Sequence, residues 1–464
     1  MVLNSDGKKK PFRKPKSPNS GSAATPAKPG LQVRAAAAKI LAAVVDRKLS
    51  LDGALDHEHG NPAYKALNDG DRALVRAILN ATLRHLPRID AAISSLLESP
   101  LPDGARALHH VLAIAAAQIL YLDVPDHAAV DLAVEQSNQD PRNRRFAKLV
   151  NAVLRRLGRE KEQVLDEINA IPVLPGWFLD RLEKAYGKER AHSISESQLE
   201  PAAIDLTVKD DAQGWAERLG GLVLPTGGVR LAAFEGGVPS LEGFAEGAWW
   251  VQDAAASIPA QLFGDLAGKR VADLCAAPGG KTAQLILAGG NVTAVEQSEN
   301  RIKRLRGNLD RLGLNAETVA SDLTKYEPAE LFDAILLDAP CSSTGTTRRH
   351  PDVLWAKGPD DIAKLAALQE RLLRHAITLL KPGGTIVFSN CSLDPAEGEE
   401  VAARVLSDTP ALERVAIDAQ QWPGLESAIN ALGEFRTTPD MLEAPSGFAS
   451  GLDGFYAVMM RRVA

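Results

Sequence analysis

Two cysteines in the second half of the chain have the surroundings of a nucleophilic site. Cys341 follows Asp338, and both Cys341 and Cys391 come directly after predicted strands, over residues 333–338 and 385–390. Consecutive strands of an open parallel sheet end over one crevice, so Asp338, Cys341 and Cys391 are predicted to converge there. A single cysteine is more often a small buried hydrophobe, but two at strand ends beside a carboxylate favour covalent catalysis by a thiolate.

A third cysteine, Cys275, lies in a glycine-rich turn over 273–282, between a predicted strand over 270–275 and a helix that begins near Thr282. Paired glycines at such a turn let a ligand approach the backbone beside a helix N-terminus. A phosphate-binding P-loop does not fit, because Cys275 stands where its first glycine belongs and Pro278 occupies the loop. The dinucleotide motif G-x-G-x-x-G is absent. A purely structural tight turn remains an alternative, and Cys275 itself is predicted to pack within the turn.

Carboxylates after the next two predicted strands favour a nucleoside ligand. Glu296 ends the strand over 291–296, and Asp322 follows the strand over 316–320. An acid about 20 residues after such a turn commonly accepts hydrogen bonds from ribose hydroxyls, although each acid alone is typical of a solvated strand end or a helix cap. Together these features predict an adenosyl pocket formed by Cys275, Ala276, Ala277, Pro278, Gly279, Gly280, Lys281, Glu296, Asp322 and Asp338.

The elements that position these residues alternate between strands and helices over residues 251–464. This alternation predicts an α/β fold, a Rossmann-like, doubly wound sheet with ligands at the carboxyl ends of its strands. Residues 31–170 instead carry helical stripes of apolar residues with few glycines or prolines, which predicts an all-α bundle. Residues 171–250 have frequent glycine and proline and short apolar stretches at 203–208 and 228–233, and they predict a small α/β linker domain.

The composition excludes several classes of protein. The 464 residues, 45% hydrophobic and 24% charged, are typical of a globular chain with several domains. Three cysteines are too few for a disulfide scaffold, and their spacing fits no zinc motif, so we expect no metal. No apolar run approaches the roughly 20 residues of a membrane helix, and the first residues lack a secretory signal. We therefore expect a cytoplasmic protein without a membrane partner.

Residues 1–30 differ in charge from the rest of the chain. They hold seven basic residues and one acid, whereas the whole chain has a net charge of −6. This segment is also rich in proline, glycine and serine, so we predict that it is a disordered basic tail. It is either a solubilising tail or an arm for a polyanion such as RNA. The acidic remainder argues against broad non-specific binding of nucleic acid.

The motifs described above resemble a known family over residues 247–464, the S-adenosylmethionine-dependent RNA cytosine-5 methyltransferases that use two cysteines. The helical region resembles the antitermination-factor (NusB-like) domain that one branch of this family carries, a branch that acts on bacterial small-subunit ribosomal RNA. The stretches that carry the resemblance are 126–130, 149–155, 251–253, 273–282, 338–341, 348–352, 390–392 and 453–456.

The resemblance implies S-adenosylmethionine as cofactor and methylation of cytosine C5 in small-subunit (16S) ribosomal RNA. It implies that Cys391 adds to cytosine C6, that Cys341 assists the later release, and that Asp338 hydrogen-bonds the ring edge. Lys281 is expected to neutralise nearby carboxylates, with an exposed loop lysine as the alternative. Asn390 stands where the family usually has threonine, a change that we expect to leave activity intact.

The resemblance also implies an RNA partner, a monomer, and a target base in single-stranded or looped RNA, because the base must leave its stack to reach a thiol. The candidate RNA contacts are Arg142, Arg144, Arg145, Lys148, Arg348 and Arg349, each of which alone is equally well explained as a solvated charge. Two other functions stay open. One is a transfer-RNA cytosine-5 methyltransferase, and the other is a non-catalytic RNA-binding or antitermination factor that uses residues 31–170.

Overall fold

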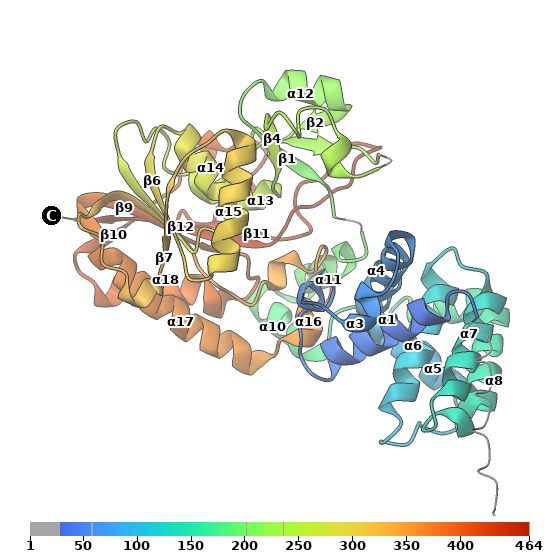
Figure 1. Ribbon diagram of the computed structural model, residues 1–464. Coiled ribbons are helices and arrows are strands. Elements are labelled where there is room, and N and C mark those ends of the chain that lie inside the picture. The colour runs from blue at the N-terminus through green and yellow to red at the C-terminus, as the bar shows by residue number, and fades with distance from the viewer. Residues whose placement is uncertain (1–27, 57–58, 201, 235, 464) are drawn as a thin grey trace, which may run out of the picture.

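The structure, a computed structural model, describes residues 28–56, 59–200, 202–234 and 236–463 (Figure 1). The predicted basic tail therefore lies outside the described residues, apart from its last three. Among these, the Lys28 ammonium lies 2.9 Å from an Asp131 carboxylate oxygen.

Helices account for the N-terminal part, which we call the helical bundle. Its members are α1 (Leu31–Val45), α2 (Leu51–Ala54), α3 (Pro62–Lys65), α4 (Asp69–Arg84), α5 (Leu86–Leu96), α6 (Arg106–Tyr121), α7 (Asp126–Gln139), the 3-10 turn η1 (Arg144–Phe146), α8 (Ala147–Arg159) and α9 (Lys161–Ile168). Helix α6 is buried along nearly its whole length, which explains why its sequence is apolar on every side. Asp69 and Asp71 lie in the first turn of α4, where the Asn68 side chain accepts a hydrogen bond from the Asp71 amide and caps the helix.

Two helices and a small antiparallel sheet follow the bundle. The elements are α10 (Gly176–Tyr186), α11 (Lys188–Ser197), β1 (Asp205–Val208), α12 (Ala212–Leu219), β2 (Gly221–Val223), β3 (Val229–Leu231), η2 (Val238–Ser240) and β4 (Trp249–Val251). The sheet has the order β2-β3-β1-β4, and the two predicted strands of this region are β1 and β3. Helices α10 and α11 pack against Leu354 and Leu393, far along the chain, rather than against this sheet.

The predicted α/β fold is confirmed from α13 onward. Its elements are α13 (Ala254–Gln261), β5 (Arg270–Leu274), α14 (Gly280–Leu287), β6 (Asn291–Glu296), α15 (Glu299–Leu312), β7 (Glu317–Ala320), η3 (Leu323–Lys325), β8 (Phe332–Asp338), η4 (Thr344–Thr346), α16 (Val353–Ala356), α17 (Pro359–Thr378), β9 (Leu380–Asn390), η5 (Pro395–Glu397), α18 (Glu399–Asp408), β10 (Leu412–Val415), η6 (Ala419–Gln421), η7 (Glu426–Ala428), β11 (Phe435–Thr437) and β12 (Phe455–Arg462). We call this part the sheet domain.

The large sheet is mixed rather than wholly parallel. Its order is β10-β12-β9-β8-β5-β6-β7, with β11 paired to β12. Strands β5 to β9 are parallel, so their carboxyl ends meet at one edge, whereas β12 runs antiparallel between β9 and β10. The parallel half places the ends of β5, β6, β8 and β9 around one site, as the predicted alternation requires.

The helical bundle and the sheet domain lie at opposite ends of the molecule, with α10, α11 and α16 between them (Figure 1). The segment that contains α16 contacts the bundle directly. Asp352 accepts a hydrogen bond from the Leu51 amide at 2.8 Å, and the Trp355 indole donates to the Leu83 carbonyl at 2.9 Å. Because α16 follows Cys341 by only a dozen residues, this contact connects the bundle to the predicted site.

Candidate functional site

The turn between β5 and α14 has the geometry of a ligand-binding loop. The amides of Cys275 and Ala276 both donate to the Val295 carbonyl, which holds the turn against β6. Gly279 has a φ of +103°, and a Cβ there would lie 3.1 Å from the Leu305 side chain, so glycine suits this position. Arg301 donates to the Ala277 carbonyl and thereby ties α15 to the turn.

Asp273, near the end of β5, is a buried carboxyl beneath this turn. One oxygen accepts a hydrogen bond from Thr282 Oγ1 at 2.5 Å, and the other is buried with no hydrogen-bond partner in the described part of the chain. Burial raises the pKa of Asp273 to about 7. The pair fixes the first residue of the turn to the start of α14.

Two further carboxylates face a cavity of about 300 Å³ at the ends of the parallel strands. Glu296 accepts a hydrogen bond from the Ser298 amide and lies 3.0 Å from Arg301 Nη1. Asp322 accepts from the amide and hydroxyl of Thr324, which lower its pKa. Among the residues predicted for the adenosyl pocket, those that line this cavity are Cys275, Ala277, Glu296, Asp322 and Asp338. Those outside its lining are Ala276, Pro278, Gly279, Gly280 and Lys281.

The predicted convergence of the two cysteines is confirmed. The Sγ atoms of Cys341 and Cys391 lie 3.4 Å apart, and both residues line the same cavity. Strands β8 and β9 are paired with Asp338 opposite Ser389, so the segments that follow them leave the sheet side by side. Residues 50 positions apart in the sequence thus meet because parallel pairing aligns the ends of their strands.

Asp338 is held in place between these cysteines and the turn. One of its carboxylate oxygens accepts from Ser389 Oγ at 3.0 Å, and the other lies 2.8 Å from Lys281 Nζ. The Lys281 ammonium also lies 4.8 Å from the centre of the Phe455 ring. Lys281 is therefore a partly buried partner of Asp338 rather than an exposed loop lysine.

The three thiols differ in their surroundings. Burial raises the pKa of Cys275 to about 12, so Cys275 stays a neutral thiol where it packs against the core beneath the cavity. The hydrogen bond to Cys391 raises the pKa of Cys341, and burial and the charge of Glu397 add to this effect. Cys341 is thus held protonated at neutral pH beside Cys391.

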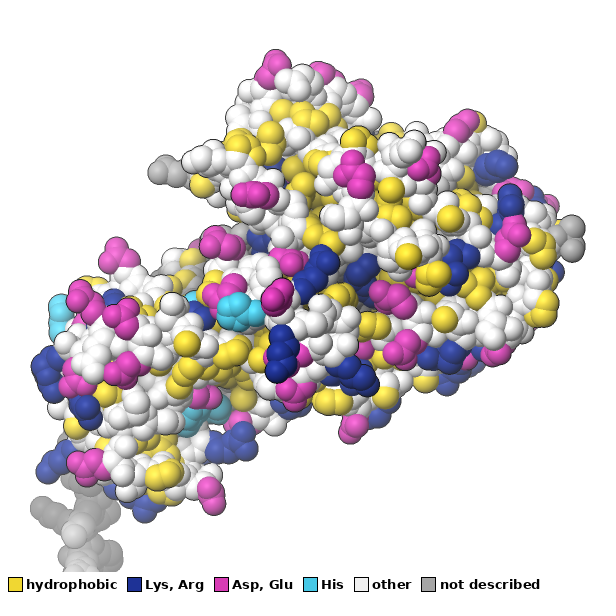
Figure 2. Space-filling view, turned by 180° about the vertical axis from the view of Figure 1, so that it is seen from behind, with side chains coloured by type: hydrophobic (Ala, Val, Ile, Leu, Met, Phe, Trp, Pro, Cys, Tyr) yellow, Lys and Arg dark blue, Asp and Glu magenta, His cyan; other side chains and the backbone are white. Residues whose placement is uncertain are grey.

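The predicted RNA contacts fall into two groups. Arg142, Arg144, Arg145 and Lys148 are exposed near the junction of α7 and α8. Arg142 and Arg145 line a cavity of about 1040 Å³ within the helical bundle. On the face shown in Figure 2, basic side chains are interspersed with acidic ones rather than gathered into one broad patch.

Arg348 and Arg349 do not project into solvent, so their position argues against contacts to an RNA backbone. Arg348 is only 2% exposed and donates to the Ser450 carbonyl. Arg349 lies between Asp253 and Asp453, which hold its guanidinium in two ion pairs. These two arginines join the start and the end of the sheet domain.

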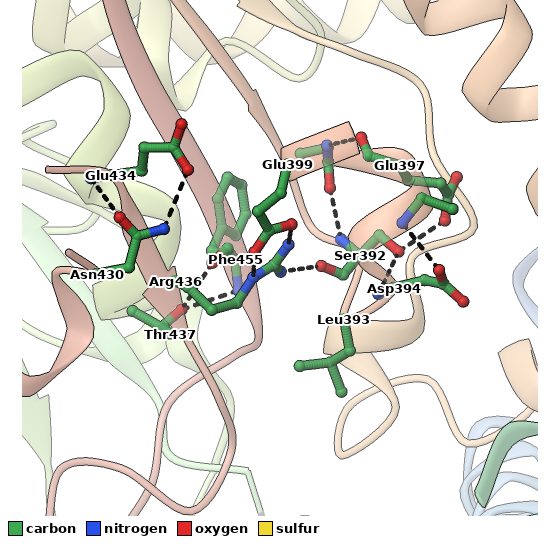
Figure 3. A network of polar contacts seen from close by, with 12 residues as sticks. Ser392, Leu393, Asp394, Glu397, Glu399, Asn430, Glu434, Arg436, Thr437 and Phe455 are labelled. Atoms are coloured by element: carbon green, nitrogen blue, oxygen red, sulfur yellow. Dashed lines mark hydrogen bonds and ion pairs between the residues drawn. The ribbon is translucent and has the colours of Figure 1, made fainter. Parts of the chain in front are cut away.

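A buried polar network around Cys391 was not found by sequence reasoning. Ser392 and Glu397 follow Cys391, and Arg436 comes from β11 to donate to the Ser392 carbonyl (Figure 3). Asn390, which replaces the threonine of the family, accepts from the Ser392 amide and donates to the Glu397 carbonyl. Glu397 lies only six residues after Cys391, which could have marked it, whereas nothing local marks Arg436.

Two further features concern metals and membranes. Over the described ranges, no cluster of three or more histidine, cysteine or carboxylate side chains is arranged to hold a metal ion. Within the same ranges, no helix combines the length and apolar character needed to cross a membrane.

Comparison with protein families gives two matches. A model described as 16S rRNA methyltransferase RsmB/F matches residues 263–458, and a model of the NusB family matches residues 31–159. The curated protein ribosomal RNA small subunit methyltransferase B of Vibrio vulnificus (strain YJ016) is 37% identical over 414 residues, which are 85% of this chain and 95% of the relative.

Solved structures share the fold. The crystal structure of PH0851 covers 94% of this chain and 99% of its own, with a TM-score of 0.71 and 21% identity. A methyltransferase homolog protein from Pyrococcus horikoshii is 30% identical, with a TM-score of 0.50, over 62% of this chain and 100% of its own.

Proposed function

The chain belongs to the 16S rRNA methyltransferase RsmB/F family, and from that premise we propose that it transfers a methyl group from S-adenosylmethionine to C5 of a cytosine in small-subunit ribosomal RNA. The reaction passes through a covalent bond between Cys391 and cytosine C6. The observation that carries the proposal is the pair of thiols 3.4 Å apart in one cavity with Asp338.

The cavity suits the cofactor. Its volume of about 300 Å³ lies at the lower end of the range for small-ligand pockets, about 300–1,000 Å³. Glu296 and Asp322 present carboxylate oxygens that can accept from ribose hydroxyls and the adenine amino group. When bound, S-adenosylmethionine supplies an electrophilic methyl group on a sulfonium.

Cys391 starts the chemistry because C5 of cytosine is a weak nucleophile. Once the Cys391 thiol has lost its proton to water, the thiolate adds to C6, and the electron pair displaced from the C5–C6 bond makes C5 able to attack the methyl group. Asp338 accepts a hydrogen bond from the cytosine amino group at the ring edge, and the positive charge of its partner Lys281 offsets the negative charge that develops at N3.

Release then requires two bonds to break. A base removes the C5 proton, its electron pair restores the C5–C6 bond, and the Cys391 thiolate leaves C6. Cys341, a protonated thiol beside the C–S bond, assists this elimination. The target cytosine must be unstacked to reach Cys391, which favours looped or single-stranded RNA, with the exposed basic residues of the bundle beside the strand.

Replacement of each cysteine tests the assignment. The Cys391→Ala variant should transfer no methyl group from radiolabelled S-adenosylmethionine to 16S ribosomal RNA, while calorimetry shows cofactor binding like that of the wild type. The Cys341→Ala variant should accumulate a protein–RNA adduct on a denaturing gel. Methyl transfer by the Cys391→Ala variant would refute the nucleophile, and full turnover without adduct in the Cys341→Ala variant would refute the release role.

The substrate needs a separate measurement. Bisulfite sequencing of total RNA from a strain that lacks the protein should show that one 5-methylcytosine of 16S ribosomal RNA is lost. The 5-methylcytosines of transfer RNA should all remain. If 5-methylcytosine is lost only from transfer RNA, the protein is a transfer-RNA methyltransferase and the proposed ribosomal substrate is wrong.

A further inference from the structure

We propose that Glu397 is a positioning residue that holds the segments of Cys341 and Cys391 at one fixed separation. Glu397 does not touch the cavity, and its side chain is fully buried. It belongs to the 3-10 turn η5, six residues after Cys391. The proposal rests on the proposed function, because it concerns the two thiols of that reaction.

The contacts of Glu397 reach both cysteine segments. Oε1 accepts from the Ser342 amide at 2.8 Å, and Oε2 accepts from the hydroxyl of Ser342 and, at 2.6 Å, from the hydroxyl of Ser392. Ser342 follows Cys341 directly, and Ser392 follows Cys391 directly. One carboxylate therefore bridges the neighbours of both thiols, and Figure 3 shows Glu397 and Ser392 joined in this network.

Every group that contacts this carboxylate is a donor. The set is completed by Gln369 Nε2, 3.2 Å from Oε1. An ionised carboxylate only accepts hydrogen bonds, so it can satisfy all four donors at once, whereas a glutamine would offer one accepting oxygen and one donating nitrogen. Glutamine at position 397 would leave one side of the bridge unmade, with the Ser392 and Ser342 hydroxyls competing for the remaining oxygen.

A fully buried carboxylate such as Glu397 is energetically costly, so its presence here calls for a physical explanation. Burial raises the pKa of Glu397, and the described residues offer it hydrogen bonds but no ion pair. Buried charges are costly unless they are well paired, and a purely structural turn could be built from neutral groups. The charge of Glu397 also helps to raise the pKa of Cys341, which keeps that neighbour protonated. The bridge and the charge together suit a residue that sets the distance between the two thiols and keeps Cys341 protonated.

Chemical cross-linking of the two thiols reads their separation without RNA or cofactor. The oxidant diamide converts two nearby thiols to a disulfide and is itself reduced, and mass spectrometry identifies the Cys341–Cys391 peptide. The full chain with Glu397→Gln should form this disulfide about fivefold more slowly than the wild type, because the relative position of the thiols is less well defined. The matched control is Glu400→Gln, the same change at an exposed position three residues later, which should react like the wild type.

Methyl transfer gives the second measurement. Glu397→Gln should lower kcat about tenfold to a hundredfold while KM for RNA and for S-adenosylmethionine stay within twofold, because misplaced reacting groups slow chemistry more than binding. The proposal would be overturned if the Glu397→Gln protein formed the disulfide at the wild-type rate. It would also be overturned if kcat fell only in proportion to the fraction of protein that fails to fold.

The serines keep the proposal testable if Glu397→Gln does not fold. Ser392→Ala removes the hydrogen bond from the Cys391 side, and Ser342→Ala removes one of the two from the Cys341 side, where the Ser342 amide still donates to Oε1. Each variant should therefore slow cross-linking, and wild-type rates in both would overturn the proposal. Since cross-linking needs neither substrate nor methyl transfer, its result is separate from failure of the proposed function. If Glu397→Gln slows cross-linking as expected but the wild-type protein does not methylate cytosine, the proposed function is refuted and the positioning role of Glu397 is retained.

Discussion

The segments that carry the two cysteines are fixed in different ways. The Cys391 loop, residues 390–398, is held on all sides by buried groups. Its Ser392 carbonyl accepts from Arg436, and its Leu393 carbonyl accepts from the Tyr186 hydroxyl of α10. The Cys341 loop, residues 339–358, is fixed near its start by Glu397 but extends outward to the helical bundle, where Trp355 and Asp352 make its distal contacts.

This difference decides how a shift of the helical bundle would reach each cysteine. Anything that shifts the bundle relative to the sheet domain acts on the Cys341 loop first, through the contacts of α16. Within the described residues, the Cys391 loop has hydrogen-bond partners in β11 and α10 and also in η4, which belongs to the Cys341 loop, so a shift of the bundle reaches Cys391 through that loop.

Removal of Arg436 should have the largest effect, because it breaks the internal support of the Cys391 loop. The guanidinium is nearly fully buried and pairs with Glu399, so Arg436→Ala leaves a carboxylate and a carbonyl without their donor. We expect a loss of about 3–5 kcal/mol in the free energy of unfolding, measured by urea denaturation. Arg404→Ala, which removes an exposed arginine of α18, should cost less than about 1 kcal/mol. An equal, small cost for both variants would show that the loop is held by other contacts.

Truncation of Trp355 should have an intermediate effect and act on the other loop. Trp355→Ala removes the indole that packs against the core of the bundle and leaves the Leu83 carbonyl without its donor, at a cost of about 1–3 kcal/mol. Turnover should fall about tenfold with build-up of the RNA adduct, because the Cys341 loop loses its distal anchor. Trp355→Phe loses the hydrogen bond but keeps an aromatic ring, smaller than the indole, so its turnover should lie between those of the wild type and Trp355→Ala. Wild-type turnover and no adduct in Trp355→Ala would show that the bundle does not influence Cys341.

Much of this arrangement could be predicted from local pattern. The family resemblance and the fold class are confirmed, because they depend on motifs at strand ends and on apolar periodicity that are continuous in the sequence. The meeting of Cys341 and Cys391 followed from one rule, that parallel strands end at a common edge. The roles of the site residues remain predictions.

The missed features depend on distant partners. The sequence of a basic pair in a loop is the same whether the pair faces solvent, as the predicted RNA contacts Arg348 and Arg349 would, or lies beside a buried acid. Asp253 and Asp453, which bind Arg349, lie about a hundred residues away in either direction. The insertion of β12 between β9 and β10 likewise cannot be deduced from chain order, because an antiparallel strand can join either edge of a sheet.

The smallest expected effect concerns Asp352, the buried carboxyl that joins the Cys341 loop to the bundle. Burial raises the pKa of Asp352 above its ordinary value of 3.8, so the folded chain keeps this proton at pH values where the unfolded chain has lost it. Its contribution to stability is therefore fully present below pH 3.8 and is lost as the pH rises through the raised pKa.

Asp352→Asn removes this titration while an amide oxygen can still accept from the Leu51 amide. The Tm of the variant should thus gain on that of the wild type as the pH rises from 4 towards neutrality, measured by thermal unfolding in matched buffers. Asp360→Asn, at an exposed position at the start of α17, corrects for the general effect of removing one acid. If the Tm of Asp352→Asn instead falls relative to that of the wild type as the pH rises, the ionised form of Asp352 is the one that joins the Cys341 loop to the bundle. The distal anchor would then depend on charge rather than on a neutral hydrogen bond.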